Sequence, residues 1–217
     1  MTISHIYSIL YPQYGFLYLI GRLAFPLFAW SIANGAIHTK NVKAYVVRLL
    51  VLAIISQVPY VVSHRLLDPS FWELNVVFTL LCGLLAVRVL TTSWDTPLKA
   101  AAVVFIAAAA ETTKMDYGAA GVLSVVSFYL FKNHPWKLLM AQFGVMLIML
   151  GHPAYEIIKS GQIYFNNLLY FGNVFGLLSL ILIHFYNGKR GMNLKYTFYI
   201  YYPLHFIILF LIRGYLW

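Results

Sequence analysis

The chain has 217 residues, of which 62% are hydrophobic and 10% are charged, and its mean hydropathy is +0.78. Soluble domains are about 45–50% apolar and about 25% charged, so this composition excludes an ordinary soluble protein and predicts an integral membrane protein. The net charge of +9 comes from basic residues in short segments between apolar runs, without the basic stripe and interleaved aromatics of a nucleic-acid-binding surface. We therefore expect a lipid bilayer, and no nucleic acid, as a partner.

Apolar runs recur along the whole chain, and most approach the roughly 20 residues that a spanning helix needs. Short segments rich in Pro, Gly, Asn and charge separate them. The first apolar run, residues 1–12, is too short to span and resembles the end of a helix whose first part is absent. We predict one all-α domain over residues 1–217, a polytopic bundle of about eight spanning helices plus a short N-terminal apolar helix. The predicted spans are 15–37, 43–62, 73–91, 97–114, 117–132, 136–151, 163–186 and 195–214.

Basic residues are distributed unequally between the two ends of these helices. One set of connections and helix ends holds ten of them: Lys40, Lys43, Arg48, Arg88, Lys99, Lys132, Lys137, Lys189, Arg190 and Lys195. The opposite set holds four, Arg65, Lys114, Lys159 and Arg213, together with most of the acidic residues. Because cytoplasmic connections of membrane proteins carry the excess of Lys and Arg, the first set is predicted to be cytoplasmic. Glu73 and Asp116 then belong to the outer half.

Arg22 lies inside the first long apolar run, about a third of the way from its outer end. A charged side chain at the centre of a span costs about 2.5–3.5 kcal/mol, so its presence needs an explanation. The side chain could snorkel to the outer interface, or it could face the bundle interior and meet a carboxylate or an anionic substrate. Pro26 favours the interior, because it frees the carbonyl of Arg22 from its helical hydrogen bond.

Other polar side chains gather in the same predicted half of the membrane, and the candidate catalytic set is completed by His5, Glu73, Asn75, Asp116, Tyr117, Tyr201 and His205. The last two are four residues apart and therefore share one helix face. Histidine combined with arginine, carboxylates and tyrosines suits proton transfer at a buried site, with histidine as the general base. The sequence carries no HExxH motif and no paired cysteines, so we expect no metal.

Four segments in order, "SHIYSILYPQYGFLYLIGRLAFPLFAW", "ELNVVFTL", "DYGAAGVL" and "FYIYYPLHFIILFLI", resemble the TraX family. That family comprises conjugative-transfer membrane proteins linked to N-terminal acetylation of pilin, and it is related to the type 3 membrane acyltransferases. The resemblance covers nearly the whole chain. It implies a multi-pass protein of the bacterial cytoplasmic membrane that transfers an acetyl group from cytoplasmic acetyl-CoA to an acceptor at the outer face. That acceptor would be a pilin N-terminus, a glycan or a lipid.

The resemblance also implies roles for single residues. His5 matches the family's histidine, which favours it over His205 as the base. Ser4 stands where the family pattern has an aspartate, so the imidazole lacks a charged partner at this position. Arg22 would stabilise the oxyanion of an acyl-transfer intermediate. The phosphates of CoA would contact the cytoplasmic residues Lys40, Lys43, Lys189 and Arg190, although positive-inside charge alone also explains these four.

Two other classes of function remain open at this point. A transporter would use intramembrane Arg and His to line a solute or proton route, and it should show two related halves with interrupted helices in matching positions. No such repeat is evident in the sequence. A non-catalytic assembly component of a conjugation or transfer apparatus would need no convergent cluster of buried polar residues.

Overall fold

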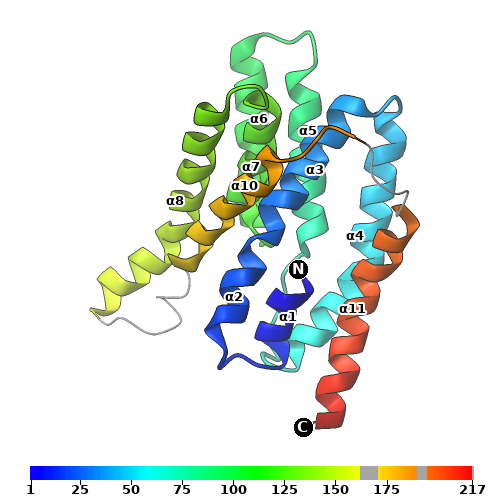
Figure 1. Cartoon of the computed structure of the whole chain (residues 1–217), viewed down its shortest axis with the longest axis vertical. Helices are drawn as coiled ribbons and strands as arrows, with labels where there is room; N and C mark the ends of the chain where they lie inside the picture. The colour runs from blue at the N-terminus through cyan, green and yellow to red at the C-terminus, as the bar shows by residue number, and fades with distance from the viewer. Residues whose placement is uncertain (162–170, 190–194, 217) are drawn as a thin grey trace.

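The computed structural model describes residues 1–161, 171–189 and 195–216. Within these ranges the chain is all-α, as predicted. One isolated parallel β-bridge joins Leu74 and Met115. Figure 1 shows the course of the chain. In chain order the elements are α1 (Thr2–Ile9), α2 (Gly15–Arg22), α3 (Ala24–His38), α4 (Val42–Arg65), α5 (Val76–Leu90), α6 (Thr96–Thr112), α7 (Gly118–Leu130), α8 (Pro135–Ser160), the 3-10 helix η1 (Phe171–Leu178), α10 (Ser179–His184) and α11 (Lys195–Leu216).

Three stretches of the described chain are helical, long and apolar enough to cross a membrane: Gly15–His38, Val42–Arg65 and Tyr196–Leu216. The first combines α2 and α3, the second is α4 and the third is most of α11. Four shorter apolar helices accompany them, at Val76–Leu90, Gly118–Leu130, Pro135–Gly151 and Phe171–His184. The predicted count of eight spans is therefore not confirmed. The predicted span 163–186 lies partly outside the described residues.

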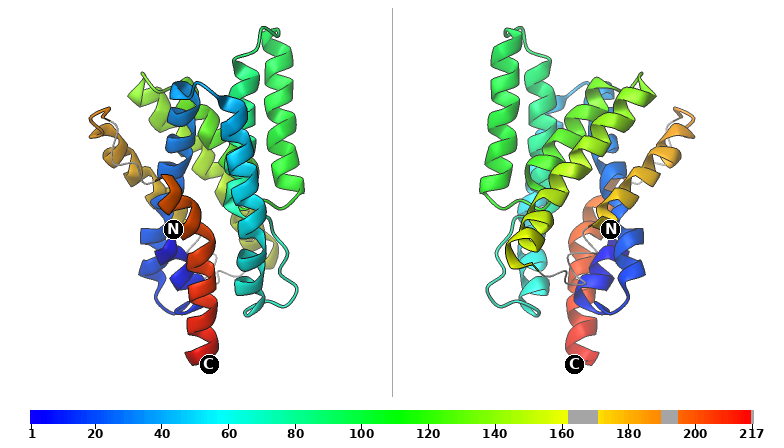
Figure 2. Two further views of the ribbon diagram at one scale, coloured as in Figure 1. Left: turned by 90° about the vertical axis from the view of Figure 1, so that its right-hand side faces the viewer. Right: turned by 90° about the vertical axis from the view of Figure 1, so that its left-hand side faces the viewer.

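Helix α7 forms the centre of the bundle. It is buried along almost its whole length and packs against α3, α5, α6 and α8. Small residues such as Gly121 and Ser124 let these neighbouring helices approach closely. Close packing of this kind drives helix association in membranes, because lipid is as apolar as the helix surfaces. Figure 2 shows α6 at one edge of the bundle, beside α5. Helices α4 and α11 pack on each other, and α1 lies against α2 and α11.

The turns after α3, α5 and α7 lie toward one end of the molecule, and the α4–α5 connection and the C-terminus lie toward the other (Figures 1 and 2). From the set predicted to be cytoplasmic, Lys40 and Lys132 lie in the first group of turns, and Lys99 lies in the first turn of α6 beside them. The unequal distribution of basic residues thus corresponds to two physical ends of the bundle. Which end faces the cytoplasm stays a prediction.

Two helix boundaries differ clearly from the prediction, and the structure gives a reason for the first. Helix α5 begins at Val76 rather than at residue 73, because Leu74 is extended and donates its N–H to the carbonyl of Lys114 at 3.0 Å, while Asp116 donates its N–H to the Leu74 carbonyl at 2.8 Å. Helix α8 continues to Ser160, beyond the predicted end at 151. The interruption between α2 and α3 falls at Leu23, one turn before Pro26, as the missing proline N–H requires.

Candidate active site

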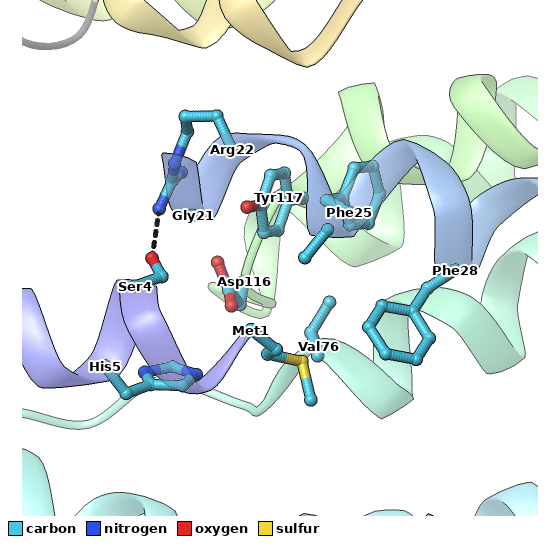
Figure 3. A pocket seen from close by; sticks show the side chains of 11 residues that line it. Met1, Ser4, His5, Gly21, Arg22, Phe25, Phe28, Val76, Asp116 and Tyr117 are labelled. Carbon is cyan, nitrogen blue, oxygen red and sulfur yellow. Dashed lines mark hydrogen bonds between the residues drawn. The ribbon is translucent and has the colours of Figure 1, made fainter. Parts of the chain in front are cut away.

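Arg22 is the last residue of α2, and its guanidinium reaches across to α1 and η1. Nη2 donates to Ser4 Oγ at 2.9 Å (Figure 3). Nη1 donates to Asn173 Oδ1 at 3.4 Å. The guanidinium carbon lies 4.3 Å from the ring centroid of Tyr18 and 5.5 Å from that of Tyr117. Partners from three further segments thus surround the side chain, and the geometry is that of an interior arginine rather than a snorkelling one.

The approach of α1 to Arg22 depends on Gly21. A Cβ atom at this position would lie 2.5 Å from Ser4 Cβ and 2.8 Å from Ser4 Cα, closer than side chains tolerate. The lack of a side chain at Gly21 therefore lets α1 lie against α2 and brings Ser4 within hydrogen-bond distance of Arg22. This contact explains why a glycine precedes Arg22: Gly21 leaves the space that Ser4, the partner of Arg22, occupies.

Asp116 and Tyr117 are placed by the tight turn between α6 and α7. The backbone of Asp116 is fixed from two sides, because its N–H donates to Leu74 and its carbonyl accepts from the hydroxyl of Thr79. Tyr117 takes the left-handed conformation, with φ of +66°, and its ring stacks on Phe25 at 3.8 Å between centroids and 10° between planes. This backbone turn directs both side chains back toward Arg22 (Figure 3).

Burial changes the proton affinity of the groups around Arg22. Desolvation raises the pKa of Asp116 from 3.8 to about 6, although the positive charge of Arg22 opposes the shift. Desolvation also lowers the pKa of His5, and the neighbouring His205 and His64 lower it further. At neutral pH the imidazole of His5 is therefore neutral, which is the form that can accept a proton.

His5 belongs to a cluster of three histidines. Its ring centroid lies 5.3 Å from that of His205 and 5.7 Å from that of His64, and 4.5 Å from the ring of Phe206. Nδ1 of His205 lies within hydrogen-bond distance of the Tyr201 carbonyl oxygen, at 3.2 Å. Nε2 of His205 is buried and has no hydrogen-bond partner among the described residues. The predicted pairing of Tyr201 with His205 on one helix face is also present, with the two rings stacked 5.6 Å apart.

A small chamber separates two larger clefts at this site. The chamber, of about 40 Å³, is lined on its polar side by Ser4, His5, Arg22, Asp116 and Tyr117. It shares Met1, Phe28 and Val76 with an apolar cleft of about 620 Å³ between the start of α1 and helices α3, α4, α5 and α11. It shares Arg22, Asp116 and Tyr117 with a polar cleft of about 740 Å³ beside the α6–α7 turn. The chamber therefore lies between the two clefts.

The remaining predicted site residues are distributed around these cavities. Glu73 lines the polar cleft and Tyr201 lines the apolar cleft, so the structure separates these two. Asn75 is fully buried and caps α5: its Oδ1 accepts from the N–H of Val77 at 3.0 Å, and its Nδ2 donates to Gln57 at 2.9 Å. These bonds give Asn75 a positioning role for the chain that leads to Val76.

The three predicted CoA-binding residues that the structure describes are not among those that line the chamber. Lys40 and Lys43 are exposed at the α3–α4 turn, near the end of the apolar cleft that Ser31 and Tyr45 line. Lys189 is exposed in the segment after α10, and Arg190 lies outside the described residues. Among the residues that the structure describes, no three His, Cys, Asp or Glu side chains are grouped so that they could hold a metal ion.

Comparison with known proteins confirms the family resemblance seen in the sequence. The model of the family described as "TraX protein" matches residues 1–213. The chain belongs to the TraX family. It is also 28% identical to the "Probable fimbrial assembly protein FimC, serogroup H1" of Dichelobacter nodosus, over 91% of this chain and 82% of that protein. No solved structure matches the chain.

Several residues at the site were not among the predicted ones. Asn173 of η1 accepts from both Arg22 and Tyr18, although no role was predicted for it from the sequence. His64 has an Nδ1 that lies 2.8 Å from the Tyr60 carbonyl, and it stood in a segment expected to be a loop. The one available signal for Asn173 was an amide within an apolar run, which membrane helices rarely carry without a partner.

Proposed function

We propose that this TraX-family protein is a membrane acetyltransferase that moves an acetyl group from acetyl-CoA to an amine or hydroxyl presented at the outer face. The observation that supports the proposal is the position of the polar chamber between an apolar cleft and a polar cleft. The apolar cleft would receive the pantetheine arm and thioester of the donor, and the polar cleft would receive the acceptor. The two substrates would then meet at His5 and Arg22.

The proposed reaction is a direct acyl transfer. The acceptor nitrogen or oxygen forms a bond to the thioester carbonyl carbon while its proton passes to His5. Arg22 faces the oxyanion of the tetrahedral intermediate and stabilises it, because its donors are already oriented by Ser4 and Asn173. Collapse of the intermediate breaks the carbon–sulfur bond, and the proton held by His5 goes to the leaving CoA thiolate. Asp116, which lines both the chamber and the polar cleft, would hold an incoming ammonium group.

The proposed orientation places the apolar cleft on the cytoplasmic side. The α3–α4 turn, with Lys40 and Lys43, would lie at the donor entrance and contact the phosphates of CoA, together with Lys189 and Arg190. The protein would cross the bacterial cytoplasmic membrane several times, with the shorter apolar helices completing the bundle. The name of the Dichelobacter relative connects that protein with fimbrial assembly. This connection favours a pilus subunit as the acceptor here over a glycan or a lipid.

A second candidate function follows from the same name. The chain could act as a non-catalytic component of pilus assembly or of a conjugation apparatus. Such a role needs surfaces for partners and makes no use of a buried base beside an arginine. Substitution of His5 by Ala would then leave pilus assembly intact, whereas an acetyltransferase would lose its activity.

The test uses proteoliposomes or membranes that contain the full chain, with acetyl-CoA labelled in the acetyl group. We expect label to appear in an envelope component, and mass spectrometry then identifies the acceptor. His5→Ala should abolish the transfer, while His134→Ala, a change at an exposed histidine before α8, should not. Absence of transfer in the wild type, with purified pilin, envelope glycan and lipid each supplied, would reject the enzymatic proposal.

A further inference from the structure

We propose that Val76 and Phe28 limit this site to short acyl groups, so that the protein transfers acetyl and rejects longer acyl thioesters. This inference rests on the proposed acyltransferase function and deepens it. Val76 and Phe28 line both the chamber and the apolar cleft together with Met1, so these three residues form the passage between the two cavities. Figure 3 shows Val76 and Phe28 at the end of the chamber remote from Arg22.

The size of the chamber sets the limit. When the thioester carbonyl lies beside Arg22, the sulfur and the pantetheine arm occupy the passage between Val76 and Phe28. The acyl tail therefore has to fit within the chamber itself, whose volume is about 40 Å³, against about 620 Å³ for the apolar cleft. The three heavy atoms of an acetyl group fill a space of a few waters, and each further methylene requires the walls to move.

The walls of the chamber are held by contacts that resist such movement. Phe25 stacks on Tyr117 with 3.8 Å between ring centroids, which holds both rings in place in the wall of the chamber. Val76 is 5% exposed and follows Asn75, whose amide is bonded to Gln57 and to the N–H of Val77. On the opposite side Gly21 contacts Ser4 without room for a Cβ atom. Close-packed walls of this kind give a sharp size limit, because overpacking forces strained side-chain conformations.

Adjacent valines on α5 provide a matched pair of variants. Val76 lines the chamber and the apolar cleft, whereas Val77 lines the apolar cleft alone, and the two side chains are 5% and 4% exposed. Val76→Ala removes the same atoms as Val77→Ala but enlarges the chamber. A change in acyl-chain preference that is confined to Val76→Ala would assign the limit to the chamber and not to the donor cleft as a whole.

The experiment measures transfer from acetyl-, propionyl- and butyryl-CoA to one acceptor, with the full-length protein in proteoliposomes. For the wild type we expect the rate to fall at least about tenfold for each added methylene. Val76→Ala should raise the butyryl-to-acetyl ratio at least about tenfold, and Val77→Ala should leave the ratio unchanged. Phe28→Ala opens the same passage from α3 and serves if Val76→Ala fails to fold.

The outcomes separate the inference from the function on which it rests. Equal rates with all three thioesters in the wild type would overturn the size limit while leaving an acyltransferase in place. An unchanged ratio in Val76→Ala and Phe28→Ala, or an equal shift in Val77→Ala, would overturn the assignment to this passage. If no thioester gives transfer in the wild type, the proposed function fails, and the size limit fails with it.

Discussion

At the scale of single residues, Arg22 is the group on which most contacts of the site converge. Its guanidinium is bonded to Ser4 and Asn173 and lies over the ring of Tyr18. The sequence was sufficient to single it out, because a charge in an apolar run needs a partner. It was not sufficient to name that partner, since Asn173 is far away along the chain and has no spacing that links it to Arg22.

Arg22→Lys should lower acetyl transfer by about 10²–10³-fold, in the range of a lost oxyanion donor. Lysine keeps the charge but loses the planar fork that bonds Ser4 and Asn173 together. Initial rates with labelled acetyl-CoA measure the effect, and Arg65→Lys at an exposed position is the control. A near-normal rate in Arg22→Lys, with equal protein in the membrane, would show that the charge alone suffices.

Ser4→Asp should raise the melting temperature of the detergent-solubilised protein. The hydroxyl of Ser4 already accepts from Arg22 at 2.9 Å, and a carboxylate at this place would make a charge-assisted bond of roughly twice the strength. The predicted role of this position was to orient His5, but the structure turns it toward Arg22 instead. The gain should disappear in an Arg22→Gln background, and its persistence there would contradict the pairing.

Asp116→Asn should stabilise the protein at pH 7.5 and leave its stability almost unchanged at pH 4. The pKa of Asp116 is raised from 3.8 to about 6 in the folded state, so the folded chain binds the proton more tightly than the unfolded chain. Stability is therefore lost as the pH rises from about 4 to about 6, and the amide removes this loss. The melting temperatures of the wild type and of Asp116→Asn at the two pH values measure the difference. A destabilised Asp116→Asn at pH 7.5 would mean that the ionised carboxylate has a strong partner.

At the scale of the helices, the sequence predicted the elements better than their ends. Apolar runs located every helix that the structure describes, and Pro26 marked the interruption between α2 and α3. The start of α5 was missed because residue Leu74 pairs with the distant α6–α7 turn, a contact that no local pattern encodes. The chamber could not be predicted from the sequence for the same reason, because α1, α2, α5 and the α6–α7 turn each supply part of its wall.

Gly118→Ala should destabilise the start of α7 by at least about 1–2 kcal/mol, the price of a left-handed conformation for a residue with a side chain. Gly118 has φ of +44°, and a Cβ atom there would lie 2.2 Å from Glu111 Oε2, the oxygen that accepts from the N–H of Ala119 at 2.9 Å. Gly144→Ala in α8 is the control, because a Cβ atom there meets nothing within 4 Å. Thermal unfolding in detergent compares the two, and equal melting temperatures would contradict the argument.

At the scale of the whole molecule, the distribution of charge predicts how the bundle sits in the bilayer. The turns that contain Lys40 and Lys132, and the start of α6 with Lys99, should be cytoplasmic. Single cysteines introduced beside Lys40 and Lys189, in a chain whose Cys82 has been replaced, should react with an impermeant thiol reagent only after the cells are opened. Cysteines beside Asp68 should react in intact cells. Labelling of the Lys40 turn from outside would invert the orientation and place the apolar cleft on the wrong side.

The small volume of the chamber bears on the energy supply of the cell as well as on the reaction. A cavity needs about 10–15 Å³ to hold one water, so a chamber of about 40 Å³ admits at most a few. Two clefts from opposite faces that met in a wide, hydrated passage would let protons run down the electrochemical gradient of the membrane. In the proposed reaction, a narrow junction lined by Met1, Phe28 and Val76 would let an acyl group reach the acceptor while the membrane stays electrically insulating.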